Sequence, residues 1–480
     1  MRATATTEAP ASTAADTIVV GVFEDEGIAH DLPSGELAAL LDRGEAKRSF
    51  KHLAVWHHEG RRWILAGLGA RGQFDAERAR VTAAVVHGRA KELGSSALCW
   101  EVPHHVAEDV VGALVEGTML AAYRFDRHKS AQNGDGRVEE LVLSAHHDVS
   151  AAVERSSIIG EAVNAARDLQ NAPANVLTPT ALGERALALE GVKAEVEGPA
   201  QIEARGMGSF MAVARGSYEE PRLITLTYAP TDARGPHLAF VGKAVTFDSG
   251  GISIKSGAKM ADMKFDMSGG AAVVEAIGAI ARLGLPVRIT GVVGATENMP
   301  SGRSMRPSDV VTAMNGTTIE VINTDCEGRM VLADCLAHAV DLGAERIVDL
   351  ATLTGAMASF FGSTYAGLLG DDDDWVETVR AAGERTGELV WPLPLHDEYE
   401  ELIEGSTGDI VNLNEPRGAG AITAAHFLQH FTGEVPWAHI DMAGVADGLG
   451  RAYAPKGGAG WGVRLLVALA AQVAEDSGSA

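Results

Sequence analysis

The chain of 480 residues contains few cysteines and few aromatic residues. Its three cysteines, Cys99, Cys326 and Cys335, form neither a CxxC motif nor an even set. A disulfide framework is therefore not expected, and a reducing cytoplasmic location suits the chain. Aromatic residues make up 5% of the chain and hydrophobic residues 46%, with Ala, Gly and Val dominating. This composition is typical of an α/β protein with buried strands and small-residue helices.

Basic residues are also scarce, with 40 Lys and Arg against 65 Asp and Glu, which gives a net charge of −25. Such a surface repels phosphate backbones and anionic lipids, and no Lys/Arg run supplies a local basic patch, so nucleic-acid binding is not expected. A strongly acidic surface is better suited to binding multivalent cations than to binding nucleic acids.

Long apolar segments are missing as well. No apolar run reaches the ~18 residues of a membrane span, so no membrane association is expected. The start, MRATATTEAPASTAADT, has no apolar core and carries acids. It is not typical of a secretory signal, and residues 1–16 are predicted to be a disordered tail.

The length predicts two domains, an N-terminal α/β domain over 17–155 and a larger domain over 156–480, with the junction on a helix near 151–169. In the first domain, apolar runs alternate with helical patterns, which indicates βαβ units. The expected elements there are strands 17–23, 62–69 and 96–102 and a helix over 76–93. In the second domain, a doubly wound architecture with a mostly parallel central sheet is expected, because apolar strands alternate with helices. The expected elements there are strands 222–228, 237–245, 287–296, 318–324, 346–353 and 437–444 and helices 268–282 and 328–342.

Two motifs in the first domain invite a functional interpretation. GLGARG (67–72) matches G-x-G-x-x-G between a strand and a helix, and Glu101 ends the next strand, although its spacing exceeds the usual ~20 residues. A tight turn is the simpler interpretation. The histidine pairs at 57–58, 104–105 and 146–147 do not lie in H-E-x-x-H and are interpreted as surface residues.

Charged residues gather around predicted strand ends in the second domain. VGKAVTFDSGGISIK (241–255) contains Lys243, Asp248 and Lys255, and Asp266 precedes the helix of 268–282. VINTDCEGRMVLAD (321–334) places Asp325, Glu327 and Arg329 between a strand-like and a helix-like stretch. Taken alone, this segment favours a solvated turn that caps the helix. If the strands are parallel neighbours, all these groups meet beyond their carboxyl ends, where open α/β sheets bind ligands.

Four converging carboxylates would repel one another and require positive charge. Lys243, Lys255 and Arg329 supply part of it. Oxygen ligands with one nitrogen donor and no thiolate fit Mn²⁺, Mg²⁺ or Zn²⁺. Four acids are enough for two ions that share bridging carboxylates and activate a water.

NTDCEGRM resembles NTDAEGRL, the signature of the leucyl aminopeptidase family, also called cytosol aminopeptidases. The resemblance covers residues 160–475 closely and the first domain loosely. It includes the segment 241–255 and several further motifs, namely DMKFDM, ENMPSGRSMRPSDVVTAMNG (297–316), DLATLTGAM (349–357) and WAHIDMAGV (437–445). Small departures such as Cys326 for Ala and Met330 for Leu leave the charged positions unchanged.

The resemblance implies roles for residues at matching positions. Asp248 and Glu327 would bridge two divalent ions, either Mn²⁺ or Zn²⁺, and Lys255 and Arg329 would be the catalytic cations, with bicarbonate held by Arg329. The implied metal ligands are Lys243, Asp248, Asp266, Asp325 and Glu327. The implied substrate pocket contains Met263, Thr352, Gly355, Ala443 and Ala446.

The resemblance further implies a metalloexopeptidase that removes the N-terminal residue of peptides, prefers Leu and other large apolar residues, and uses a metal-bridging hydroxide. It implies a smaller N-terminal α/β domain, a larger catalytic domain and a homo-hexamer. Two alternatives remain, a nucleotide-binding oxidoreductase that uses GLGARG and a secondary DNA-binding regulatory role.

Overall fold

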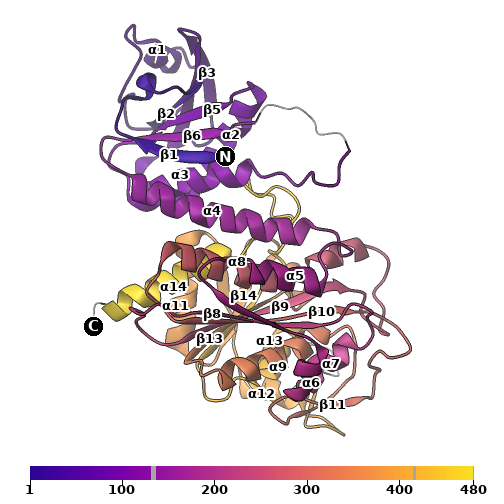
Figure 1. Cartoon of the computed structure of the whole chain (residues 1–480). Helices are drawn as coiled ribbons and strands as arrows, with labels where there is room; N and C mark the ends of the chain where they lie inside the picture. Colours follow the sequence, from indigo (N-terminus) through magenta and orange to yellow (C-terminus); the bar gives the residue numbers. More distant parts are fainter. Residues whose placement is uncertain (131–136, 415–417, 479–480) are drawn as a thin grey trace. The chain divides into compact units, whose positions relative to one another are not determined.

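The computed structural model describes residues 1–130, 137–414 and 418–478 and divides the chain into two compact units (Figure 1). The first comprises Met1–Asn164 with Gly450–Pro455, and the second comprises Ala165–Leu449 with Lys456–Ala480. The division falls on helix α4 (Ser150–Asn171), the helix on which the sequence places the domain junction, but after residue 164 rather than after 155. The return of residues 450–455 to the first unit is not predicted from the sequence.

The first unit contains a six-stranded sheet in the order β1-β6-β5-β2-β4-β3, parallel throughout except for the edge strand β3. Its strands are β1 (Arg2–Thr6), β2 (Thr17–Phe23), β3 (Leu53–His58), β4 (Arg61–Gly69), β5 (Ala97–Glu101) and β6 (Glu140–Ser144). The predicted strands 17–23, 62–69 and 96–102 correspond to β2, β4 and β5. Helices α2 (Ala76–Glu92) and α3 (Glu108–Ala121) contribute their buried residues to the core of this sheet.

The prediction of a disordered tail over residues 1–16 is wrong. Residues 2–6 form β1, which pairs in parallel with β6 from Arg2 opposite Glu140 to Thr6 opposite Ser144. Ala3 and Ala5 pack against the core beneath the sheet, whereas the neighbouring polar side chains point away from it. A polar, alternating segment of this kind is stable as an edge strand only because β6 offers it a hydrogen-bonding partner.

The GLGARG segment forms a strand end and a tight turn. Gly67 lies in β4, where an added Cβ would come within 2.3 Å of the Ser49 carbonyl oxygen, and Gly69 has φ +75°. A short 3-10 turn, η2 (Arg71–Gln73), follows, and α2 begins only at Ala76. Chain packing and a turn therefore account for these glycines.

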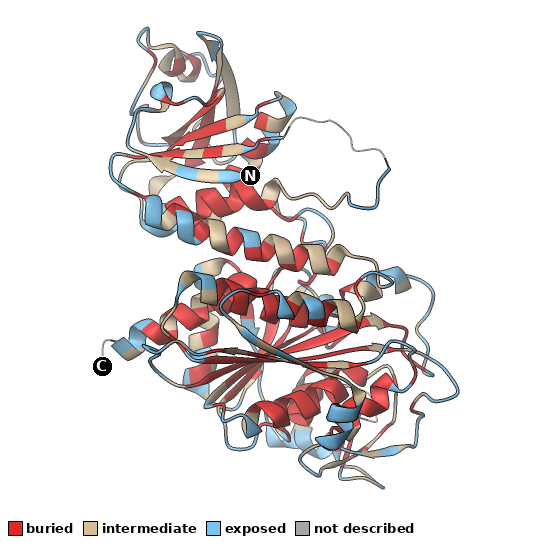
Figure 2. Cartoon of the chain, in the orientation of Figure 1, coloured by how far each residue is buried: buried red, intermediate tan, exposed pale blue. Residues whose placement is uncertain are grey.

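The second unit is built on an eight-stranded sheet in the order β15-β14-β17-β13-β9-β10-β8-β7. Its four central strands, β17, β13, β9 and β10, are mutually parallel and almost completely buried (Figure 2). Towards the edges, β8 is antiparallel to β10 and to β7, and β14 is antiparallel to β17. The strands are β7 (Lys193–Glu197), β8 (Arg222–Tyr228), β9 (Leu238–Asp248), β10 (Ile289–Asn298), β13 (Arg346–Ala351), β14 (Ala366–Gly370), β15 (Val390–Pro392) and β17 (Trp437–Asp441).

Helices cover both faces of this sheet, as expected for a doubly wound domain (Figure 1). Helices α8 (Ser268–Leu283), α11 (Asp373–Thr386) and α14 (Val463–Gly478) lie on one face. Helices α7 (Gly208–Ala214), α9 (Glu327–Asp341) and α13 (Gly420–Gln429) lie on the other. Among the described residues, no helix combines the length and the apolar character required to cross a bilayer.

One strand prediction in this unit is wrong in length and in place. The segment 318–324 forms only the short strand β12 (Thr318–Glu320), which belongs to a separate small sheet with β11 (Val310–Thr312) and β16 (Ile410–Val411). Beyond Glu320, the backbone N–H groups of Ile322 and Asn323 donate to the side-chain oxygen of Asn412, at 2.7 and 3.2 Å. A side chain thus replaces the strand partner that the pattern predicted.

Candidate metal centre

Strand β9 brings the first charged residues to the site. Lys243 lies within the strand and Asp248 is its last residue, at the carboxyl end of the parallel centre of the sheet. The Oδ1 atom of Asp248 accepts hydrogen bonds from the Gly250 N–H and from the Asn298 amide, both at 2.9 Å. Gly250 has φ +87° and Gly251 φ +63°, a left-handed turn that L-residues rarely adopt. This turn returns the chain so that Lys255 faces Asp248.

Asp266 comes from a different segment. It follows the 3-10 turn η3 (Met260–Phe265) and precedes α8. Its Oδ1 atom accepts a hydrogen bond from the Thr352 hydroxyl at 2.8 Å and lies 2.8 Å from the Lys243 amine. Asp266 is therefore oriented by the loop that follows β13.

Asp325 and Glu327 are brought in at the start of α9. Glu327 is the first helical residue, where the positive end of the helix dipole stabilises a carboxylate. The preceding turn is fixed by Thr324, whose hydroxyl donates to the Gly250 carbonyl at 2.7 Å and accepts from the Ser253 N–H at 2.8 Å. The N-terminus of α9 and the loop after β9 thus form one hydrogen-bonded unit.

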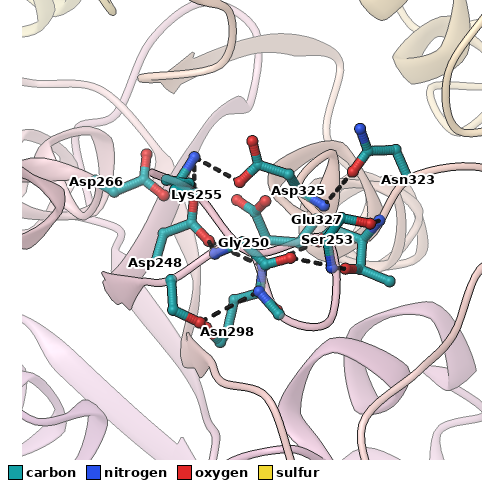
Figure 3. Close-up of polar contacts among 12 residues, drawn as sticks. Asp248, Gly250, Ser253, Lys255, Asp266, Asn298, Asn323, Asp325 and Glu327 are labelled. Carbon is teal, nitrogen blue, oxygen red and sulfur yellow. Dashed lines mark hydrogen bonds and ion pairs between the residues drawn. The ribbon is translucent and has the colours of Figure 1, made fainter. Parts of the chain in front are cut away.

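The charged groups form a continuous network (Figure 3). The Lys243 amine lies 2.8 Å from Asp266 Oδ1 and 3.0 Å from Glu327 Oε1. The Lys255 amine lies 2.7 Å from Asp248 Oδ2 and 2.6 Å from Asp325 Oδ1. Carboxylate oxygens of Asp248, Asp325 and Glu327 lie within 4.8 Å of one another. The structure therefore brings together all five residues that the sequence predicts as metal ligands, together with Lys255.

Burial and mutual repulsion perturb the ionisation of this network. Burial raises the pKa of Glu327, and the nearby Asp248 charge raises it further. Burial likewise raises the pKa of Asp266, an effect that Lys243 opposes. For Lys243, burial alone would lower the pKa, but the surrounding carboxylates outweigh it and raise the pKa above its usual range. Without metal, the two lysines are the cations that hold the cluster together.

The cluster contains carboxylate oxygens that could bind divalent cations. The Oδ2 atom of Asp266 and the Oε2 atom of Glu327 are buried without a hydrogen-bond partner among the described residues. Leaving a buried carboxylate oxygen unsatisfied costs about 1–3 kcal/mol or more. A set of carboxylate oxygens with an amine nitrogen and no thiolate matches the ligand preferences of Mn²⁺, Mg²⁺ and Zn²⁺. The residues present therefore fit a metal centre.

Arg329 lies two residues beyond Glu327 on α9 and is 4% exposed. Its Nε and Nη1 atoms have no hydrogen-bond partner in the described part of the chain, and its guanidinium carbon lies 6.0 Å from the centre of the Phe427 ring. A buried planar cation with two unused donors can bind a planar oxyanion.

The predicted pocket residues come from the turn η3, from the loop after β13 with the start of α10, and from the loop after β17. Thr352 binds Asp266, and Met263 lies in η3 immediately before it. The Asp441 carboxylate accepts from the N–H groups of Thr354 and Ala443, at 3.3 and 3.2 Å, and so joins the two loops. Gly355 is exposed at the start of α10 (Gly355–Phe361), whereas Ala446 is 1% exposed.

Sequence reasoning missed the residues that position the ligands. Asn298, the last residue of β10, donates to Asp248 at 2.9 Å and to the Thr324 carbonyl at 3.0 Å. It is 2% exposed, yet nothing in its local pattern distinguishes it from a solvated strand end. The sequence feature that could have pointed to Asn298 is its position just after the apolar run of a predicted buried strand.

Comparison with known proteins agrees with this geometry. The sequence profile of the cytosol aminopeptidase family, catalytic domain, matches residues 164–467, and that of the N-terminal domain of the same family matches residues 19–132. A probable cytosol aminopeptidase of Roseiflexus castenholzii is 42% identical over 97% of this chain and 98% of its own length. One from Syntrophotalea carbinolica is 44% identical over 86% of both chains.

A solved structure, the bottromycin maturation enzyme BotP in complex with Mn, is similar with a TM-score of 0.88 and 35% identity, over 96% of this chain and all of its own. These relatives support a metal-dependent aminopeptidase activity for this chain, which is a hydrolase activity. The chain belongs to the cytosol aminopeptidase family.

Proposed function

We propose that this protein is a binuclear metalloaminopeptidase that releases large apolar N-terminal residues, Leu above all, from peptides. The observation that carries the proposal is the largely buried network of four carboxylates and two lysines, in which two carboxylate oxygens have no hydrogen-bond partner among the described residues. The relatives support the general activity, and the preference for Leu is our inference from the predicted pocket.

Five residues would hold two divalent ions, Mn²⁺ or Zn²⁺. Those ions supply Lewis-acid polarisation of the scissile carbonyl and activation of a water when bound. Glu327 and Asp248 are suited to bridging, because Glu327 lies near both Lys243 and the Asp248–Asp325 pair. Lys243 and Asp266 would complete one site and Asp325 the other. Lys243 must lose its proton to act as a ligand, so metal binding is coupled to proton release.

Lys255 and Arg329 would act on the substrate and on the proton. The Lys255 amine is paired with Asp248 and Asp325, and with those carboxylates engaged by cations it would be available to stabilise the negative oxygen that develops on the scissile carbonyl. Arg329 would hold a bicarbonate through Nε and Nη1, which have no hydrogen-bond partner in the described part of the chain, and the group would supply general acid–base chemistry when bound.

The predicted pocket supports an apolar preference. Met263, Gly355, Ala443 and Ala446 carry no charge, and the Thr352 hydroxyl is already bound to Asp266. Burial of a Leu side chain there is worth ~1.5–3 kcal/mol, whereas an unpaired charged side chain would be desolvated at a cost. A cytoplasmic location and a homo-hexamer belong to the same proposal.

The test is hydrolysis of a leucine anilide by the purified protein, with metal content measured in parallel. A strong chelator should abolish activity, and Mn²⁺, Zn²⁺ or Co²⁺ should restore it. The Asp266→Ala and Glu327→Ala variants should behave like the metal-free enzyme, and Glu327→Ala should be the more impaired because Glu327 would bridge both ions. Asp374→Ala, at an exposed carboxylate of α11, is the control. Full activity in protein shown to be metal-free would disprove the proposal.

A further inference from the structure

A second group of metal-binding side chains lies in the first unit, far along the chain from the carboxylate–lysine network. His30, His104 and His146 each follow a strand of the six-stranded sheet, namely β2, β5 and β6. These three strands are adjacent and parallel, so their carboxyl ends meet at the same edge. Open parallel sheets bind ligands at this edge. His146 is exposed and His104 is partly exposed, in keeping with their interpretation as surface residues, but the sequence did not predict that they meet His30.

The three imidazole rings converge closely. The Nε2 atoms of His104 and His146 lie 2.5 Å apart, within hydrogen-bonding distance of each other. The ring centres of His104 and His146 are 4.2 Å apart, and that of His30 lies 5.3 Å from each. One nitrogen from each ring lies within 4.8 Å of the other two. Three imidazole nitrogens gathered at this spacing could serve as the ligands of an open His₃ metal site.

A buried carboxylate orients one of these rings. The Glu101 side chain, at the end of β5, is 8% exposed and pairs with the Nδ1 atom of His30. This contact makes Nδ1 the donor nitrogen and turns Nε2 of His30 into the atom available for a cation. Histidines that bind metals in proteins usually have such a carboxylate behind them, because it fixes the tautomer and increases ligand basicity.

The surroundings favour a cation over an anion. The nearby guanidinium of Arg71 is already paired with Glu26 and donates to the His104 carbonyl oxygen at 2.8 Å. A cavity of about 360 Å³, lined by His104, His105, His146 and His147, leaves room beside the cluster for a further ligand such as water.

We propose that His30, His104 and His146 form a binding site for a divalent transition-metal ion of the zinc class, with Glu101 as the positioning carboxylate. Imidazole nitrogens suit Zn²⁺, Ni²⁺ and Cu²⁺, in contrast to the oxygen-rich centre of the catalytic unit. The site is independent of the proposed peptidase function.

The test uses the full-length protein, dialysed against Zn²⁺ and assayed for metal content per chain. The His104→Ala/His146→Ala double variant should contain one zinc ion fewer than the wild type. The same difference should persist when Asp266→Ala and Glu327→Ala are also present, because those changes affect only the carboxylate–lysine network. His147→Ala, next to the cluster, and His57→Ala, on β3, are matched controls that should keep the wild-type content.

Calorimetric titration with Zn²⁺ tests the role of Glu101. Glu101→Gln should weaken zinc binding at this site ~10–100-fold, the usual effect of removing such a partner. Circular dichroism establishes whether each variant is folded. If the double variant does not fold, the single variant His146→Ala, which changes an exposed residue, replaces it. An unchanged zinc content in the folded histidine variants, or an equal loss in His147→Ala, would overturn the site. Unchanged affinity in Glu101→Gln would overturn the positioning role.

Discussion

Lys255 contacts two carboxylates of the network, Asp248 and Asp325, and its side chain is 25% exposed. We expect Lys255→Ala to lower kcat by ~10²–10³-fold, as typically follows the loss of one oxyanion donor. KM should change much less, because the ammonium interacts with charge that develops only in the transition state. Steady-state kinetics on a leucine anilide measure both parameters.

Lys193→Ala is the control for this substitution, since Lys193 on β7 forms a comparable ion pair with Glu195, at 2.6 Å, on the surface. Its kinetics should match those of the wild type. An unchanged kcat in Lys255→Ala, or a change confined to KM, would contradict the assignment.

Gly328 separates Glu327 from Arg329 at the start of α9, and its lack of a side chain makes room for Lys243. A Cβ at this position would lie 2.6 Å from the Lys243 amine nitrogen. Lys243 is 3% exposed and held by carboxylates, so it cannot move without disturbing the network. We expect Gly328→Ala to lose metal and at least ~10-fold in activity while remaining folded, since alanine is the better helix former.

Gly420→Ala, on α13, tests the specificity of this effect, because no atom of the described residues lies within 4 Å of an added Cβ there. Elemental analysis and activity should be normal in that variant. If Gly328→Ala binds metal as tightly as the wild type, the close packing of Lys243 against α9 is not needed for the centre.

At the scale of elements, the residues predicted to line the substrate pocket lie on η3, on the loop between β13 and α10, at the start of α10, and on the loop after β17. We expect kcat/KM over an X-Gly dipeptide series to favour Leu, Met and Phe, with differences among them within ~200-fold. Ala446 is almost fully buried, so Ala446→Met must take space from its surroundings and should penalise Phe more than Leu. Faster cleavage of Asp-Gly or Lys-Gly than of Leu-Gly would show that the pocket is misassigned.

Helix α2 buries a histidine that makes the stability of the first unit depend on pH. Burial lowers the pKa of His87 to about 4 from 6.5, and the nearby Lys91 charge contributes. The unfolded chain therefore binds a proton that the folded chain rejects, and stability should fall as the pH decreases from about 6.5 towards 4. The full effect of this difference is roughly 3 kcal/mol.

Thermal melts of the wild type and His87→Gln between pH 7 and 4.5 measure this dependence. The loss of stability on acidification should be smaller in His87→Gln, and His57→Gln, at an exposed position of β3, should retain the wild-type profile. Parallel profiles for the wild type and His87→Gln would contradict the prediction.

At the scale of the whole molecule, the family resemblance predicts a homo-hexamer. Light scattering coupled to size-exclusion chromatography should give a mass six times that of one chain. Because the chain carries a net charge of −25, self-repulsion should weaken association at low ionic strength, and the mass should be measured over a range of salt concentrations. A monomeric mass at every salt concentration would exclude the hexamer.

The sequence by itself determined the elements whose patterns are local and the identity of the charged residues. Continuous apolar, β-branched runs gave strands at 17–23 and 222–228 with the predicted bounds. The alternation of strands and helices was sufficient for the doubly wound fold. The motif at 323–330 places Asp325 and Glu327 at the start of a helix, and its resemblance to the family signature implied that they are metal ligands.

Only the tertiary structure decided which distant segments meet. Residues 2–6 become a strand because β6, far along the chain, offers an edge, and β12 stays outside the central sheet because Asn412 binds the segment that follows it. His30, His104 and His146 converge because β2, β5 and β6 are neighbours in the sheet. Strand order depends on the summed packing of the entire core and on long-range pairing, which no local propensity encodes.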